Sequence, residues 1–258
     1  MDKRKTNILI KKLALLAAWI SVIVLTILGI NAANKHLGNT VLQNIEISIS
    51  PTQSAFVTQN DIKQIIAREV SVKNTKIKEI KLYEIENSIK QNVFVKHSEC
   101  HVDMDGNLFI KVEPREALLR VFRHNGESYY VDRNAIKIPL NKNNTAHCLV
   151  VNGNIFERYI HGDSIYSMAL WQVYKIATHV DNDEFFKDQI DQIFVQANNE
   201  FVLVPKVGKH TIILGSANNL EDKLKRLKVF YKEGLNKVGW SKYKQINLKY
   251  NNQIICTK

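Results

Sequence analysis

The sequence predicts an α+β protein. An N-terminal transmembrane helix precedes a small unit of order strand, helix, helix, strand, strand, and then a larger, mainly antiparallel β domain with two flanking helices. Three observations support this prediction. An uncharged apolar run lies near the N-terminus, short segments of alternating apolar residues follow it, and a few stretches repeat apolar residues at helical spacing. Two helices on one face of a three-stranded sheet are an α+β arrangement.

The apolar run covers residues 13–30, LALLAAWISVIVLTILGI, and contains neither charge nor proline. At ~1.5 Å per residue this helix spans roughly 27 Å, close to the ~30 Å hydrocarbon core of a membrane. Its polar residues, Ser21 and Thr26, can bond to their own helix backbone. A buried core helix is disfavoured because the run is apolar on all sides.

Charge predicts the direction of insertion. One acid, Asp2, accompanies five basic residues before the run, whereas only Lys35 follows it closely. The five are Lys3, Arg4, Lys5, Lys11 and Lys12. Since positive charge stays inside, residues 1–12 are expected to be a cytoplasmic tail and the rest to be periplasmic. A cleaved signal peptide has a shorter apolar region and an A-x-A-like site, which Gly29 to Ala33 lack. We therefore expect a retained, single-pass anchor in the inner membrane.

Residues 31–258 carry 31 basic and 24 acidic residues, a net charge of +7. Such an excess suits anionic envelope material or the acidic face of a protein partner, and net charge alone does not distinguish them. No nucleic-acid partner is expected in this compartment. Cys100, Cys148 and Cys256 are too few and too widely spaced for a disulfide framework. They are interpreted as small apolar strand residues, and the sequence does not show whether any pair forms.

The first exported unit begins with a strand at residues 41–49, in which Ile45, Ile47 and Ile49 alternate. A helix follows, because Thr58 and Asp61 form a capping box and Val57 and Ile62 occupy the two positions of a hydrophobic staple. The next helix is indicated by the single face of Leu82, Ile85 and Ile89. Strands 93–103 and 108–113 then surround Asp105-Gly106, a dipeptide typical of tight hairpins.

Strands dominate the second unit. Asn125-Gly126 indicates a hairpin between its first two strands. Two helices are expected, at 164–180, where Gly162-Asp163-Ser164 resembles an N-cap, and at 219–235. The expected strands cover residues 118–122, 128–131, 148–151, 190–196, 201–205, 211–214, 245–250 and 253–257.

The search for catalytic or metal-binding residues gives no strong candidate. The run His161-Gly162-Asp163-Ser164 is interpreted as helix capping, because no G-x-S-x-G elbow exposes a serine. On a strand, His97 and His101 would face one side and Cys100 the other, which disfavours zinc. The acidic cluster of residues 181–188 is interpreted as a solvated loop. No glycine-rich phosphate loop occurs. We expect no catalytic residue, metal, cofactor or small-molecule ligand.

One feature suggests binding. The terminal strand at residues 247–256 is expected at a sheet edge, where unpaired backbone groups can accept a strand from another chain. Ile246, Leu248 and Tyr250 alternate with Asn247 and Lys249. From the residues alone, this hairpin could equally well serve only to close the core.

Taken together, these pieces resemble the bacterial cell-division family FtsQ, called DivIB in other lineages, whose first exported unit is a POTRA domain. The order and spacing of several short segments carry the resemblance over nearly the whole exported region. These segments are Leu108 to Val112 running to Arg115 and Leu119-Arg120-Val121; Tyr129 to Asp132 followed by Pro139-Leu140; Gly215 with Leu220, Lys223 and Leu227; and Tyr243, Ile246, Leu248, Lys249, Tyr250 with Gln253-Ile254-Ile255.

The chain departs from the family in two places. The turn after Asp132 usually carries a glycine, but here it reads Arg133-Asn134-Ala135, and Asn134 is expected to take the left-handed conformation. Ala117 stands where the family often has proline, while Pro114 comes earlier. The domains are therefore expected at residues 41–114 and 115–258.

The resemblance implies a non-enzymatic scaffold at the division septum. FtsQ-like proteins bind the membrane-anchored coiled-coil proteins FtsB (DivIC) and FtsL and help bring septal peptidoglycan synthesis to midcell. In the family, the partner adds a strand beside the last strands of the β domain, and a tyrosine after a basic residue is important. This pattern matches Lys249-Tyr250, so Tyr250 is the first candidate partner-binding residue, followed by Gln253, Ile254 and Ile255.

Two alternatives remain. The chain could be a POTRA protein of export or outer-membrane assembly, although such proteins normally carry repeated POTRA units and this sequence has one. It could also be an anchored envelope hydrolase, which a cleft with clustered, perturbed carboxylates or a contact between serine and histidine would favour.

Overall fold

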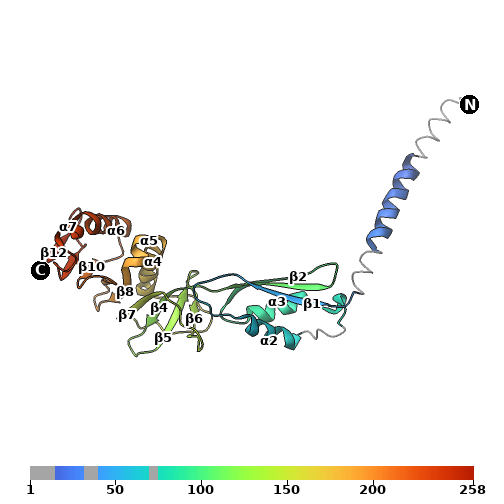
Figure 1. Ribbon diagram of the computed structural model, residues 1–258, viewed down its shortest axis with the longest axis horizontal. Coiled ribbons are helices and arrows are strands. Elements are labelled where there is room, and N and C mark those ends of the chain that lie inside the picture. The colour runs from blue at the N-terminus through green and yellow to red at the C-terminus, as the bar shows by residue number, and fades with distance from the viewer. Residues whose placement is uncertain (1–14, 32–39, 70–74) are drawn as a thin grey trace, which may run out of the picture. The chain divides into compact units, whose positions relative to one another are not determined.

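The computed structural model describes residues 15–31, 40–69 and 75–258 of the 258-residue chain. These divide into two compact units, each considered separately below (Figure 1). The first comprises Met1–Ile49, Gln59–Lys90 and Ser98–Val112, and the second comprises Ser50–Thr58, Gln91–His97 and Glu113–Lys258. The predicted domain boundaries at 41–114 and 115–258 stay predictions.

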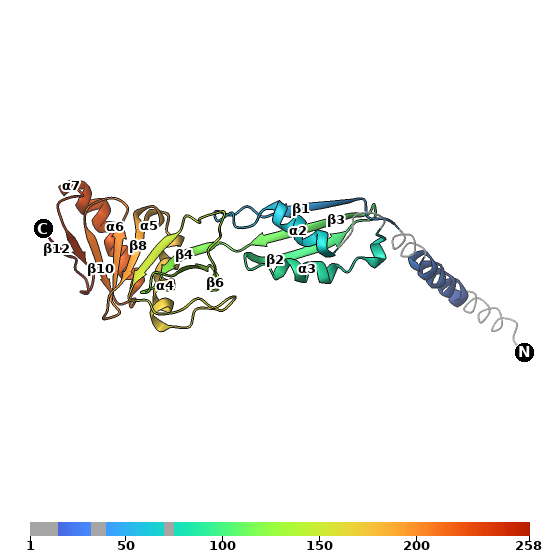
Figure 2. The ribbon, with the colours of Figure 1, turned by 90° about the horizontal axis from the view of Figure 1, so that it is seen from below.

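In the first unit, two helices lie side by side against a three-stranded sheet of order β1-β3-β2 (Figures 1 and 2). Strands β1 and β3 are parallel, and Ile45, Ile47 and Ile49 pair in register with Leu108, Ile110 and Val112. This puts six apolar residues on one face. The elements are β1 (Asn44–Ile49), α2 (Gln59–Glu69), η1 (Ile77–Glu79), α3 (Leu82–Lys90), β2 (Val95–Val102) and β3 (Asn107–Pro114).

The local signals in this unit give the observed elements. Helix α2 begins directly after Thr58, and Val57 and Ile62 of the predicted staple are both buried. Ile85 and Ile89 are the buried residues of α3. The turn before β3 contains Gly106 at a φ of 91°, a conformation that favours glycine. The predicted order of strand, helix, helix, strand, strand is confirmed.

Residues 15–31 form a helix whose side chains are all exposed. It coincides with most of the predicted membrane anchor, although residues 13 and 14 and the basic tail lie outside the described residues. Within the described ranges, no helix meets the length and hydropathy that a membrane span requires.

The second unit contains a nine-stranded sheet of order β12-β11-β10-β9-β8-β7-β4-β5-β6. Neighbours are parallel at β4–β7, β7–β8 and β10–β11 and antiparallel elsewhere, so the sheet is mixed but mainly antiparallel. The strands are β4 (Ala117–Phe122), β5 (Ser128–Asp132), β6 (Lys137–Ile138), β7 (Leu149–Gly153), β8 (Ile190–Val195), β9 (Phe201–Pro205), β10 (Thr211–Gly215), β11 (Gln245–Asn247) and β12 (Ile255–Thr257).

Helices pack on this sheet through one continuous apolar core. Helix α4 (Met168–Asn182) contributes Val173 and Ile176, and α6 (Leu220–Val229) contributes Leu224 and Leu227. The remaining helical segments are α5 (Glu184–Gln189), η2 (Phe230–Leu235), a π-helical turn, and α7 (Asn236–Val238). The chain after Val229 thus continues the predicted helix to Leu235, but with wider turns.

The predicted start of the first long helix was wrong. Ser164 does not cap it; the N-cap is Ser167, whose hydroxyl accepts a hydrogen bond from the Leu170 N–H at 3.3 Å. Residues before it are held extended, because the Glu157 carboxylate accepts bonds from the N–H groups of Tyr166 and Ser167. Gly162-Asp163-Ser164 fits the local pattern of an N-cap. The hydrogen bonds between Glu157 and the segment before the helix cannot be predicted from local sequence.

The acidic cluster of residues 181–188 was also misread as a loop. Asp183 is the N-cap of α5, and its carboxylate accepts the N–H of Phe185 at 3.0 Å.

The prediction for the turn after Asp132 was also wrong. The left-handed residue there is Ala135, at a φ of 62°, and not Asn134. The Asp132 carboxylate fixes this turn by accepting the N–H groups of Asn134 and Ile136, each at 2.8 Å.

An ion pair is buried in this unit. Lys137 Nζ lies 2.9 Å from Glu157 Oε1, and both side chains are fully buried. The Lys137 ammonium also lies 4.3 Å from the centre of the Tyr166 ring. Burial alone would raise the pKa of Glu157, but hydrogen bonds from Ser167, Lys137 and Tyr166 outweigh it and hold the pKa below its ordinary value.

Candidate protein-binding site

Strand β12 is an open edge of the nine-stranded sheet. It pairs with β11 on one side and has no neighbour on the other in the part of the chain that the structure describes. No side chain there bonds to the backbone of Ile255, Cys256 or Thr257. The Thr257 carbonyl accepts the Lys244 N–H at 2.8 Å, and the backbone groups of β12 that point away from β11 are available to an added strand.

The other sheet edges are less open. In the first unit, Gln59 of α2 donates to the Ile47 carbonyl of β1, and the Glu86 carboxylate of α3 accepts the Cys100 N–H of β2. Both edges thus carry a bond from a helix side chain. The far edge of the large sheet, β6, consists of two buried residues, Lys137 and Ile138. Covered edges of this kind resist pairing with another chain.

The structure distributes the four predicted partner-binding residues over different environments. Tyr250 is 48% exposed and lies in the connection between β11 and β12, not on a strand. Gln253 is exposed in the same connection. Ile254 is half-buried and packs against the core, whereas Ile255 is 43% exposed on β12. Three of the four are therefore accessible near the edge, and Ile254 faces inward.

Ile255 ends an apolar row on one face of the sheet. Its register partner is Asn247 on β11. The row continues from there through Ile213 on β10 and Val202 on β9 to Phe194 on β8. Phe194 is 40% exposed, and Ile213 is half-buried. The opposite face carries α4 and α6. A strand added to β12 would extend this open face by one more column of side chains.

The connection between the two last strands is anchored by residues that the sequence reading did not assign to the site. Arg226 Nη1 of α6 donates to the Tyr250 carbonyl at 3.0 Å and to the Gln253 carbonyl at 2.7 Å. Asp222, one helical turn earlier, accepts the Nε–H of Arg226 at 2.9 Å. The only sequence signal for this arrangement is the Asp222 to Arg226 spacing, which predicts a pair on one helix face but not its target.

Lys249 is held next to these residues. Its Nζ lies 2.6 Å from Glu200 Oε1, and its stem passes over Gly215, where an added Cβ would approach Lys249 Cγ to 2.7 Å. The hydrogen bond from Lys249 lowers the pKa of Glu200. Lys223 is buried and donates to the carbonyls of Leu214 and Ser216, and burial lowers its pKa. Gly215 thus leaves room for the Lys249 stem, and Lys223 ties the end of β10 to α6.

The net positive charge of residues 13–258 lies in the last forty residues, which include this hairpin. Residues 219–258 contain ten basic and three acidic residues, whereas residues 13–218 contain 21 of each. All of the last forty residues are described. Five exposed lysines of this stretch form no ion pair with a carboxylate within the described ranges, and they are Lys225, Lys232, Lys242, Lys244 and Lys258. A surface of this charge attracts an acidic partner.

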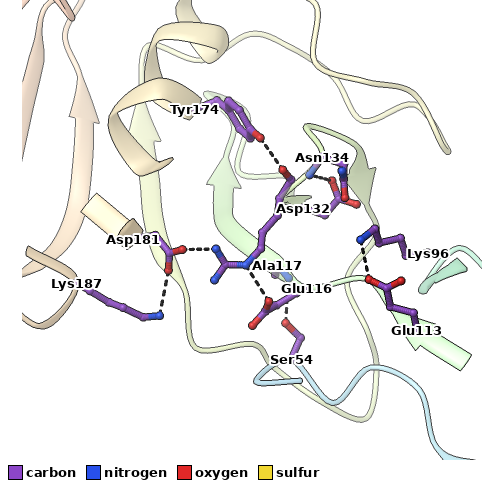
Figure 3. A network of polar contacts seen from close by, with 11 residues as sticks. Ser54, Lys96, Glu113, Glu116, Ala117, Asp132, Asn134, Tyr174, Asp181 and Lys187 are labelled. Atoms are coloured by element: carbon purple, nitrogen blue, oxygen red, sulfur yellow. Dashed lines mark hydrogen bonds and ion pairs between the residues drawn. The ribbon is translucent and has the colours of Figure 1, made fainter. Parts of the chain in front are cut away.

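A second polar region lies at the start of β4. Arg133 donates from Nε to Glu116 at 2.8 Å and bonds Asp181 through its Nη1, while Lys187 lies 3.2 Å from Asp181. The Tyr174 hydroxyl donates to the Arg133 carbonyl at 2.7 Å. Figure 3 shows Asp181, Lys187, Glu116 and Tyr174 converging on this point. Arg133, Asp181 and Lys187 border a groove of about 460 Å³.

This network does not resemble an acid–base pair. Burial alone would raise the pKa of Asp181, but its bonds to Arg133 and Lys187 outweigh this and lower it. The carboxylate therefore stays ionised and cannot act as a proton donor near neutral pH. The network ties the turn after β5 to α4 and α5, which is a structural role.

The other chemical candidates remain apart. The His161 ring lies 3.2 Å from the Tyr159 hydroxyl, and Ser164 forms an isolated bridge with Ile136. His101 stacks on Phe109 with ring centres 5.0 Å apart. Within the described residues, no group of three or more potential metal ligands gathers. Cys100, Cys148 and Cys256 are free thiols, and burial raises their pKa, to about 12 for Cys100 and Cys148.

Comparison with known families adds two matches. The model described as "FtsQ/DivIB, C-terminal related" matches residues 116–257, and a POTRA-like domain model matches residues 40–113. No curated protein matches the chain. The first match covers more than half of the sequence and includes the whole hairpin that carries the open edge.

Proposed function

Because the chain belongs to the FtsQ/DivIB family, we propose that it is a scaffold of the bacterial division machinery that works by binding other proteins and has no catalytic activity. The family is generally non-enzymatic. The POTRA-like first unit also agrees with the family's architecture. The matched order of one POTRA-like unit followed by an FtsQ/DivIB C-terminal region favours division over export or outer-membrane assembly.

The proposed mechanism is strand addition at β12. The observation that carries it is the unpaired, solvent-exposed edge of β12, beside the exposed side chains of Tyr250 and Ile255. A partner strand would gain backbone hydrogen bonds along this edge. The Tyr250 ring would add roughly 150 to 250 Å² of contact area if it became buried. The proposed partners are FtsB/DivIC-like and FtsL-like coiled-coil proteins, through which septal peptidoglycan synthesis is recruited to midcell.

The proposed location is the inner membrane at the septum. The apolar run at residues 13–30 and the basic residues before it support a single-pass anchor with a cytoplasmic N-terminus. The helix at residues 15–31 exposes its apolar side chains, as a lipid-facing helix would. An anchor would restrict the chain to two dimensions and raise the effective concentration of a partner held in the same membrane.

Substitution of Tyr250 tests the mechanism. We expect Tyr250→Ala to weaken capture of the exported segment of an FtsB-like protein by roughly 30-fold, the scale of an interface hot spot. Binding is measured by surface plasmon resonance. The matched control is Tyr83→Ala, which removes a 74% exposed tyrosine from α3. Equal binding by both variants would contradict the proposed site, provided that both melt like the wild type.

Depletion of the protein in cells tests the biological role. Filamentous cells that lack assembled septa are expected, because septal peptidoglycan synthesis would not be recruited to midcell. Normal division with defective export would instead support the rival role in envelope assembly. A hydrolase role would require activity on an envelope polymer, which depletion followed by polymer analysis would detect.

A further inference from the structure

A single arginine side chain holds the turn that leads into β12. Arg226 Nη1 donates to the carbonyls of Tyr250 and Gln253, at 3.0 and 2.7 Å. These residues are the first and last of a four-residue turn in which Asn252 has a left-handed φ of 59°. A terminal guanidinium nitrogen carries two hydrogens, so it can serve both acceptors at once. Both ends of the turn are thereby fixed to one point on α6.

Arg226 is itself held in place. Its side chain is 18% exposed, and Asp222 accepts its Nε–H at 2.9 Å. Helix α6 is packed into the core by Leu224 and Leu227 on its other side. The guanidinium therefore sits on a rigid element, and a charged donor makes stronger hydrogen bonds to carbonyls than a neutral one.

Little else orders the edge. Strand β12 has three residues and one neighbouring strand, and two of its side chains, Ile255 and Thr257, are exposed. Cys256 of β12 and the preceding residue Ile254 are half-buried and pack against the core. A short strand with so few contacts opens easily unless its turn is fixed.

We infer that Arg226 is a positioning residue of the partner-binding edge: it holds the turn at residues 250–253 so that Tyr250 and β12 are presented together to the incoming strand. This inference rests on the proposed strand addition. Its physical basis is that a partner binds only the fraction of molecules with an ordered edge, and the apparent Kd rises as this fraction falls. Arg226 does not touch the partner in this account; it acts through the turn.

Hydrogen exchange of the free, full-length chain tests the inference without a partner. Arg226→Met keeps the aliphatic stem and removes all donors. We expect exchange in the peptide covering residues 249–258 to accelerate about tenfold or more, while exchange in β8 to β10 and the urea midpoint stay close to wild type. Lys225→Met, an exposed neighbour on the same helix, is the matched control and should change neither. Arg226→Lys should give an intermediate rate, because an ammonium can replace some of the donors.

Partner binding is the second readout. With the exported segment of an FtsB-like protein as the probe, Arg226→Met should weaken binding by the factor by which the ordered fraction of the edge falls, which is no larger than the factor by which exchange accelerates. Unchanged exchange at residues 249–258, or faster exchange throughout the second unit, would overturn the inference. If the wild-type chain captures no such probe, the proposed function fails, and the exchange of the free protein alone decides whether Arg226 orders the turn.

Discussion

The Lys137–Glu157 pair shows how much one buried residue can control. Both side chains are fully buried, and the Glu157 carboxylate also accepts two backbone N–H groups before α4. Two charges taken out of water stabilise each other, because without its partner each would be a buried charge that nothing neutralises. The pair therefore links β6 to the start of α4.

Removal of one partner is expected to be costly. Lys137→Met should lower the free energy of unfolding by about 3 to 5 kcal/mol, since it leaves Glu157 uncompensated. The double variant Lys137→Met with Glu157→Gln should recover part of this loss, because the amide oxygen still accepts a backbone N–H. Urea denaturation measures both values. A double variant less stable than the single one would contradict this interpretation.

Residue identities could be predicted from the sequence where the signal is local. Thr58, Val57 and Ile62 mark a helix start through neighbours in the chain. Ala135 shows the limit, because the left-handed position was expected at Asn134 on intrinsic preference. The carboxylate of Asp132 fixes the turn instead. The role of Arg226 was equally hidden, since its acceptors lie 24 and 27 residues away in the chain.

At the scale of elements, the terminal hairpin is shorter than its sequence pattern. Strands were predicted at residues 245–250 and 253–257, but the observed strands are Gln245–Asn247 and Ile255–Thr257. Alternation of Ile246 and Leu248 did identify buried residues correctly. It could not show that the Tyr250 and Gln253 carbonyls accept hydrogen bonds from Arg226 of α6 and do not take part in strand pairing.

Two truncations separate folding from binding in this hairpin. A chain ending at Asn247 loses Leu248, which is fully buried in the core, and should lose about 2 to 5 kcal/mol of stability. A chain ending at Gln253 removes β12 with only half-buried residues, so we expect a loss of roughly 1 to 2 kcal/mol and a folded domain. Denaturant unfolding measures stability. The chain ending at Gln253 should fold but no longer capture the partner, and retained capture by this chain would exclude β12 as the site.

The charge of the whole molecule is strongly asymmetric. Residues 13–218 are balanced, whereas the last forty residues, which include β11 and β12, carry ten basic and three acidic residues. From net charge alone, anionic envelope material and an acidic partner were equally compatible with residues 31–258. The position of the charge beside an unpaired strand favours the acidic partner, because both features lie on the same few elements.

Association should therefore depend on salt. The association rate of the FtsB-like segment is expected to fall about tenfold or more between low and high ionic strength, as screening removes the attraction. Lys242→Gln with Lys244→Gln should flatten this dependence. Lys63→Gln with Lys111→Gln removes two exposed lysines elsewhere and should leave it unchanged. Stopped-flow kinetics gives the rates, and equal salt slopes for both double variants would contradict the role of the charge.

Topology was the least predictable property of the second unit. Most of its strands were placed by alternation and turn dipeptides, and the mainly antiparallel character was correct. The parallel neighbours β4–β7 and β10–β11 join segments that are separated by intervening elements. Local pattern carries no information on such pairings, so the identity of the edge strand emerges only from the assembled sheet.

Hydrogen exchange of the full chain with and without the proposed FtsB-like partner tests the central claim most directly. Strand addition at β12 predicts that the partner slows exchange in the peptide covering residues 249–258 more than in any other peptide, because new backbone bonds form there. Strong protection of β1 or β2 in the first unit, with residues 249–258 unchanged, would contradict the claim and place the partner elsewhere.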